Sequence, residues 1–103
     1  MGHDADEWLE AQEDLARLDP PAGGNPFDIS PSHFEIATEE APFSCGESGI
    51  HAVLLVYGCF RVAPDSESLG VVRYVARPGV LRHEARHAIL FALGDSRWAD
   101  VGH

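Results

Sequence analysis

Apolar residues recur every three or four positions over the first part of the chain, between Asp4 and Leu18. This spacing is the period of an α-helix with one buried face. The stripe consists of Trp8, Ala11, Leu15 and Leu18. Acidic residues at the start and Arg17 near the end suit the helix dipole, and Asp19-Pro20-Pro21 predicts where the helix stops. We therefore expect an N-terminal helix that packs on the core.

Three later segments have the pattern of β-strands. Prolines and glycines over residues 19–32 predict an irregular connection before them. HFEIAT alternates polar and apolar residues, IHAVLLVYGCFRV is a nearly continuous apolar run of the kind found in central strands, and LGVVRYVAR follows a turn. Gly58 predicts a bend in the second segment. A small sheet of about three strands is expected from residues 33–38, 50–62 and 69–77.

A second helix is predicted after Pro78-Gly79, over residues 80–93. Its apolar positions share one face, which we expect to pack on the sheet, and Gly94 suits a left-handed helix end. That face comprises Leu81, Ala85, Ala88, Ile89, Ala92 and Leu93. The remaining DSRWADVGH predicts an irregular tail that Trp98 anchors over the helix. The order helix, strands, helix predicts an α+β fold, and the length of 103 residues predicts a single domain, residues 1–103.

The charge of the chain is concentrated in its first half. The net charge is −10; through Ser44 eleven carboxylates oppose one arginine, whereas from Cys45 onward six acids balance six arginines. Nucleic-acid binding needs a basic face, so this balance argues against a nucleic-acid partner. A hydrophobic content of 45% indicates a globular chain. We attribute the acidity to solubility, with a cationic partner as the alternative.

Cys45 and Cys59 predict a disulfide. Each has a glycine neighbour, which permits a close backbone approach, and the bridge closes a loop of about 15 residues, worth about 3 kcal/mol. Two buried reduced thiols are the alternative. The longest apolar run, Ala52 to Phe60, is too short to span a bilayer. The opening MGHDADEW lacks the basic and apolar regions of a signal peptide.

The second predicted helix carries His83-Glu84-Ala85-Arg86-His87, an H-E-x-x-H motif. On a helix both imidazoles then project from one face and reach one cation at about 2.0–2.1 Å. Glu84 lies beside the first ligand, where it reaches a metal-bound water rather than the metal. In zinc hydrolases such a glutamate takes the proton of the water that attacks a carbonyl. Two solvated histidines on a surface helix are the alternative.

A zinc hydrolase needs a third protein ligand beside an open position. The metzincin pattern needs glycine at position 90 and histidine at position 93, and both positions are leucine. A thermolysin-like site needs a downstream glutamate, and none follows Glu84. The remaining candidates are Asp95, Asp100 and His103. Asp95 follows the helix end directly and is expected to point away from the metal, while Gly94 and Gly102 permit His103 to return.

The other histidines and the tyrosines have simpler interpretations. His3, His33 and His51 border predicted elements and are expected to face solvent rather than a metal. The hydroxyls of Tyr57 and Tyr74 are suited to stabilise a transition state. A tyrosine in a sheet is more often buried, so neither receives a catalytic role.

The segment HEARHAILFALGDSRWADVGH resembles the active-site segment of small zincin-like metallopeptidases of bacteria, many of them secreted proteins or lipoproteins. In these, H-E-x-x-H is followed by a hydrophobic helix end, a Gly-Asp pair and a histidine, and the upstream YGC is similar as well. The resemblance implies that His83, His87 and His103 bind zinc, that Glu84 is the general base, and that Asp95 shapes the return loop. With the cysteine pair, it favours a secreted or cell-envelope location.

Together these features predict a minimal zincin-like α+β domain with a backing helix, a small mixed sheet and an active-site helix. The expected activity is hydrolysis of peptide bonds, with one zinc ion as cofactor and a peptide or protein as substrate. An edge strand, residues 33–38 or 69–77, is expected to hold the peptide by strand addition. A zinc-binding module with a truncated, non-catalytic cleft is the alternative, and a metal-free interaction domain is a third interpretation.

Overall fold

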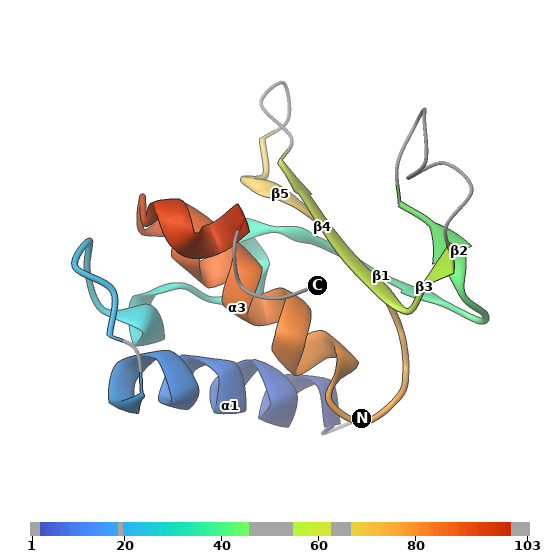
Figure 1. Ribbon diagram of the computed structural model, residues 1–103, viewed down its shortest axis with the longest axis horizontal. Helices are drawn as coiled ribbons and strands as arrows, with labels where there is room; N and C mark the ends of the chain where they lie inside the picture. Colours follow the sequence, from blue (N-terminus) through green and yellow to red (C-terminus); the bar gives the residue numbers. More distant parts are fainter. Residues whose placement is uncertain (1–2, 19, 46–54, 63–66, 100–103) are drawn as a thin grey trace.

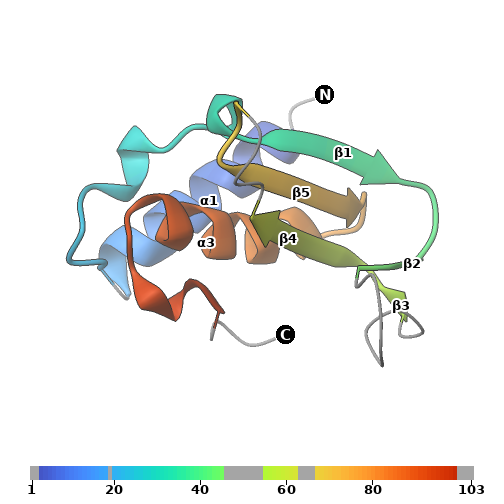
Figure 2. The same cartoon turned by 90° about the horizontal axis from the view of Figure 1, so that it is seen from above.

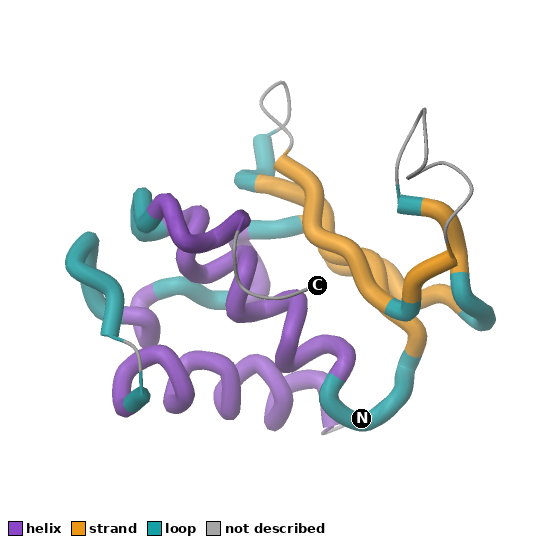
Figure 3. The backbone as a smooth tube through the Cα atoms, in the orientation of Figure 1, coloured by secondary structure: helices purple, strands orange, loops and turns teal. Residues whose placement is uncertain are grey.

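The computed structural model describes residues 3–18, 20–45, 55–62 and 67–99. Within them the chain forms two α-helices and a mixed three-stranded sheet, which confirms the predicted α+β architecture. Figure 1 shows helix α3 lying between α1 and the sheet. In Figure 3 the helices lie on one side of the molecule and the strands on the other. The elements are α1 (His3–Arg17), η1 (Pro26–Asp28), η2 (Pro31–His33), β1 (Glu35–Glu39), β2 (Phe43–Ser44), β3 (Leu55–Val56), β4 (Gly58–Val62), β5 (Gly70–Val75), α3 (Val80–Ala92) and η3 (Ser96–Ala99).

Helix α1 buries most of the predicted stripe. The buried members are Trp8, Ala11 and Leu15. Leu18 lies beyond the helix end and is 71% exposed, so its predicted burial is wrong. Gln12 is buried in the same face, and its amide donates 2.9 Å to the carbonyl of Ile29, since a buried amide needs a partner. The connection after α1 is thereby held against the helix.

The sheet has the strand order β1-β5-β4, with β1 parallel and β4 antiparallel to β5. Figure 2 shows the three strands side by side in front of the helices. The central strand β5 buries Val72 and Tyr74 in the main core with α1 and α3. Residues 69–77 therefore supply the central strand, not an edge.

The apolar run 50–62 was expected to be one central strand, and this prediction is wrong. Its described part forms β3 and the edge strand β4, which are separated at Tyr57. In the described part of this run, Phe60 packs on the main core and Cys59 is buried with Phe43 and Val75 in a second cluster, so β4 has apolar contacts on both faces. Leu55, Tyr57 and Val62 are exposed. Burial on two faces does not require a neighbour on both edges.

The second cluster is closed by the predicted disulfide. Strands β2 and β3 pair antiparallel beside it. A disulfide joins Cys45 to Cys59 of β4, with Cα atoms 6.0 Å apart, which confirms the predicted bridge. The edge strand β4 is thus covalently tied to the segment that follows β2.

Helix α3 ends as expected at Gly94, which has a φ of 72°. Gly94 N donates to Phe91 O at 3.0 Å and Asp95 N donates to Leu90 O at 2.9 Å, the pair of bonds that defines a Schellman motif. No helix within the described ranges is long and apolar enough to cross a membrane.

The segment after α3 is more regular than expected. It contains the 3-10 helix η3 rather than an irregular tail. The Trp98 ring lies 5.3 Å from Phe91 of α3 and 5.9 Å from Phe60 of β4, measured between ring centroids. The expectation that Trp98 anchors this segment over the helix is confirmed, and the anchor reaches the sheet as well.

Arg82 joins α3 to α1. Its Nε and Nη2 donate to the two carboxylate oxygens of Asp14, each at 2.7 Å, and its Nη1 donates to Glu10 at 2.8 Å. Asp14 is buried, and the hydrogen bonds from Arg82 hold its pKa below the ordinary value of 3.8. The two helices therefore share a fork-shaped ion pair at their contact.

Replacing Asp14 with asparagine should lower the free energy of unfolding by about 1–3 kcal/mol at neutral pH. Because the folded pKa is lowered, this contribution is complete above pH 3.8 and is lost as pH falls through the folded pKa. Urea unfolding should therefore show a gap between wild type and Asp14→Asn that narrows below pH 3.8. Glu13→Gln, at an exposed position of the same helix, is the control. A gap that is constant with pH would contradict this assignment.

Candidate metal centre

His83 and His87 present two ring nitrogens to one point beside α3. Their Nε2 atoms are 3.2 Å apart, and the ring planes are inclined by 76°. Two ligands of a tetrahedral zinc ion, each at 2.0–2.1 Å, lie about 3.3 Å from each other. The observed separation therefore fits two ligands of one ion. It also fits a hydrogen bond between one protonated and one bare nitrogen.

The His87 ring is oriented by a hydrogen bond to the backbone carbonyl of Trp98. It is 3% exposed, and its Nδ1 lies 2.5 Å from the carbonyl oxygen of Trp98. A carbonyl oxygen only accepts, so Nδ1 carries the proton and, in a neutral ring, Nε2 bears the lone pair. Histidines that bind metals are commonly oriented by such a bond.

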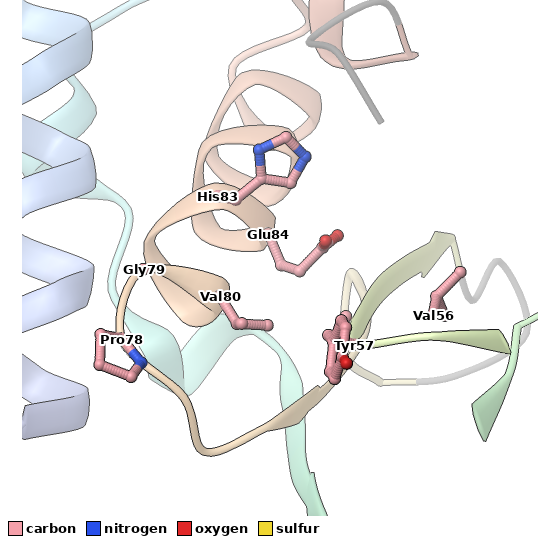
Figure 4. Close-up of a pocket in the computed structure, with 8 residues that line it drawn as sticks. Val56, Tyr57, Pro78, Gly79, Val80, His83 and Glu84 are labelled. Atoms are coloured by element: carbon pink, nitrogen blue, oxygen red, sulfur yellow. The ribbon is translucent and has the colours of Figure 1, made fainter. Parts of the chain in front are cut away.

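Glu84 lies on the side of α3 that faces the sheet. Its side chain projects from α3 toward the chain at Tyr57, as Figure 4 shows. The residue is 8% exposed, and burial raises the pKa of its carboxyl to about 7. A carboxyl in this range can both take and give a proton near neutral pH.

A pocket of about 630 Å³ opens between the start of α3 and the start of β4. It is lined by Val56, Tyr57, Gly58, Pro78, Gly79, Val80, His83 and Glu84. In Figure 4 Val80 and Glu84 project into the same space from α3, and Tyr57 stands opposite. The guanidinium of Arg77 lies 4.5 Å from the centroid of the Tyr57 ring, within cation–π range. The polar end of this pocket is His83 with Glu84, and the rest of its wall is mainly apolar.

The third ligand is not found among the described residues. No group of three or more His, Cys, Asp or Glu side chains within them is placed to hold a metal. Asp95 is engaged by Arg97, whose Nη2 donates to it at 2.7 Å. This hydrogen bond and others from Arg97 lower the pKa of the Asp95 carboxyl. The other two candidates, Asp100 and His103, lie outside the described residues.

Among the described side chains, those of His33 and Tyr74 take no part in this arrangement. His33 is exposed, as expected, and its Nδ1 lies in the turn with Ser30. Tyr74 is buried in the core. His51 and the side chain of His3 lie outside the described part of the chain.

Three contributors to the site were not predicted. Gly58, interpreted as a bend, lets β4 approach Glu84 closely, and a glycine within a strand is the signal that pointed to such an approach. Tyr57, expected to be buried, is 46% exposed and lines the pocket. The carbonyl of Trp98 orients His87, and a backbone group leaves no trace in the sequence.

Comparisons of the chain with models of known protein families, with curated proteins and with solved structures gave no significant match. The resemblance to zincin-like metallopeptidases therefore stays a prediction, and function has to be inferred from the geometry of the site.

Replacing Gly58 with alanine should strain the contact between β4 and α3. A Cβ there would lie 2.8 Å from Cγ of Glu84 and 2.9 Å from Cγ1 of Val80. Overpacking of this kind costs about 1–3 kcal/mol, which urea unfolding would measure. In a Glu84→Ala background part of the clash is gone, so the cost of Gly58→Ala should be smaller there. Equal costs in the two backgrounds would show that Gly58 and Glu84 are not coupled.

Proposed function

We propose that this protein is a zinc-dependent hydrolase of peptide bonds. The observation that carries the proposal is the 3.2 Å separation of the His83 and His87 Nε2 atoms, next to the buried carboxyl of Glu84 at the end of an open pocket. Neutral imidazole nitrogens suit zinc, and the separation suits two corners of a tetrahedron. Asp100 and His103 are the candidates for a third ligand, with His103 favoured by the resemblance.

Each residue then has a distinct task. His83 and His87 bind the metal through Nε2, and the carbonyl of Trp98 keeps the His87 ring in the required orientation. When bound, zinc acidifies a coordinated water and polarises the scissile carbonyl. Glu84 accepts the proton of the attacking water and delivers it to the leaving amine. Its burial at the polar end of the pocket supports this task, because it places the carboxyl beside His83 and away from bulk water.

The position of β4 supports an extended peptide as the substrate. Among the described strands β4 lies at the edge of the sheet, beside β5, and we propose this edge as the place where a peptide binds by strand addition. This edge lies next to the pocket through Gly58. Of the two segments expected to serve, residues 69–77 supply the central strand β5, and residues 33–38 contribute to the other edge strand, β1. A substrate side chain that enters the pocket meets the apolar surfaces of Val56 and Val80.

A second candidate function is a zinc-binding module without turnover. It would use the same pair of histidines, His83 and His87, and a structural zinc site would need its other ligands from outside the described residues. In that case zinc stabilises a small fold, as structural sites do.

Zinc content and peptide cleavage, measured together, test the proposal. Elemental analysis should find about one zinc per chain, and mass spectrometry of a mixed peptide library should show cleavage that a chelator stops and added zinc restores. His83→Gln and His87→Gln should lose both properties, whereas His33→Gln, at an exposed position, should keep both. Zinc without cleavage would favour the structural module, and a chain that binds no zinc would rule out both functions.

A further inference from the structure

The segment that follows α3 returns to the ligand face of the helix. Trp98 lies eleven positions beyond His87, yet its carbonyl contacts Nδ1 of His87. The Schellman motif at Gly94 turns the chain, and η3 brings it back. The contact therefore depends on the backbone path between the two residues, and whatever holds that path also holds the His87 ring.

Asp95 and Arg97 hold this path through several hydrogen bonds. The Asp95 carboxylate accepts from the backbone N of Arg97 at 2.9 Å, from its Nε at 3.0 Å and from its Nη2 at 2.7 Å. The backbone of Asp95 is also fixed on both sides, since its N donates to Leu90 O at 2.9 Å and its O accepts from Trp98 N at 3.2 Å. Asp95 thus forms hydrogen bonds with Leu90 of the preceding helix and with Arg97 and Trp98 in the segment that follows.

The Trp98 side chain anchors the same segment by a different interaction. Its ring packs edge-on against Phe60 and Phe91. Such contacts set where the side chain lies, but the direction of a carbonyl is set by the more directional hydrogen bonds of the backbone around it. The backbone bond nearest the Trp98 carbonyl runs from Trp98 N to Asp95 O, within the turn that the Asp95–Arg97 pair closes.

We infer that Asp95 and Arg97 are positioning residues for His87. Their ion pair directs the Trp98 carbonyl so that the ring is held as the tautomer protonated on Nδ1, with Nε2 directed at Nε2 of His83. In the zinc-binding role this inference rests on the proposed function, whereas the tautomer itself is a property of the metal-free protein. Groups that orient a metal-bound histidine in this way change metal affinity by about 10–100-fold.

Nitrogen-15 NMR of the histidine rings tests this in the metal-free protein, at a pH above the ordinary histidine pKa of about 6.5. Wild type should show His87 as a single tautomer with the proton on Nδ1. Asp95→Asn and Arg97→Gln should each give signals averaged between the two tautomers, and should weaken zinc binding by about 10–100-fold. Asp28→Asn, at an exposed position of η1, is the matched control and should change neither.

The outcomes separate this inference from the proposed function. If both variants fold and His87 keeps one tautomer in both, the inference is overturned. If Asp95→Asn does not fold, Arg97→Gln decides alone, because it leaves the Schellman turn and the Asp95 backbone bonds in place. A third outcome is that wild type shows the single tautomer, both variants lose it, and the protein binds no zinc. That result would uphold the positioning role and overturn the proposed function.

Discussion

Glu84→Gln should lower kcat/KM for a cleaved peptide by about 10²–10⁴-fold, the usual contribution of a general base. The amide has nearly the shape of the carboxyl but accepts no proton at neutral pH. Zinc should stay at about one per chain, because His83 and His87, not Glu84, are the proposed ligands. Initial rates on the best library peptide, with elemental analysis of the same sample, measure both quantities.

Glu40→Gln is the control for this experiment, because Glu40 is an exposed glutamate outside the pocket. It should leave rate and zinc content unchanged. A Glu84→Gln variant that cleaves at the wild-type rate would remove Glu84 from the mechanism. One that loses zinc as well would place its carboxyl among the ligands instead.

Removing the disulfide should have the largest effect on stability. Cys45→Ser with Cys59→Ser opens a bridge between residues 14 positions apart and should lower the free energy of unfolding by about 3 kcal/mol. That is a large share of the about 5–15 kcal/mol that holds an ordinary domain folded. Urea unfolding of wild type and of the double variant measures the difference.

Reductant supplies an internal control for this prediction. Wild type in reductant should unfold near the midpoint of the double variant, while the double variant should not respond. Cys59 lies next to Gly58, which contacts Glu84, so loss of the bridge should also lower any cleavage rate in urea well below the unfolding midpoint. Equal stability with and without the bridge would contradict the prediction.

The helices were predicted closely because each has a clear helical period. The expected ranges 4–18 and 80–93 correspond to His3–Arg17 and Val80–Ala92. The order of the strands was not predicted. Residues 50–62 have the composition of a central strand, yet their described part supplies the edge strand β4, which contacts α3 on one face and the cluster around Phe43 on the other. The amino-acid composition of a strand reflects whether its two faces are buried. It does not show whether another strand pairs with each of its edges.

The residues of the site also differ in how well the sequence predicts their positions. His83, Glu84 and His87 lie on one helix, so their spacing in the sequence predicts their relation in space. Gly58 and the carbonyl of Trp98 join them only through contacts between distant segments, which local patterns do not encode. Asp95 was expected to shape the return of the chain, and its bonds to Arg97 show how it could do so.

Helix α3 is packed on α1 on one side and on the sheet on the other, and Ala85, Ala88 and Ile89 in its middle have no exposed surface. Backbone amides at such positions exchange with solvent only when most of a domain opens. His83 and His87 therefore lie on the part of the chain that local unfolding opens least often. An incoming cation would meet a pair already ordered by folding, and little further conformational entropy would be lost in gathering those two ligands.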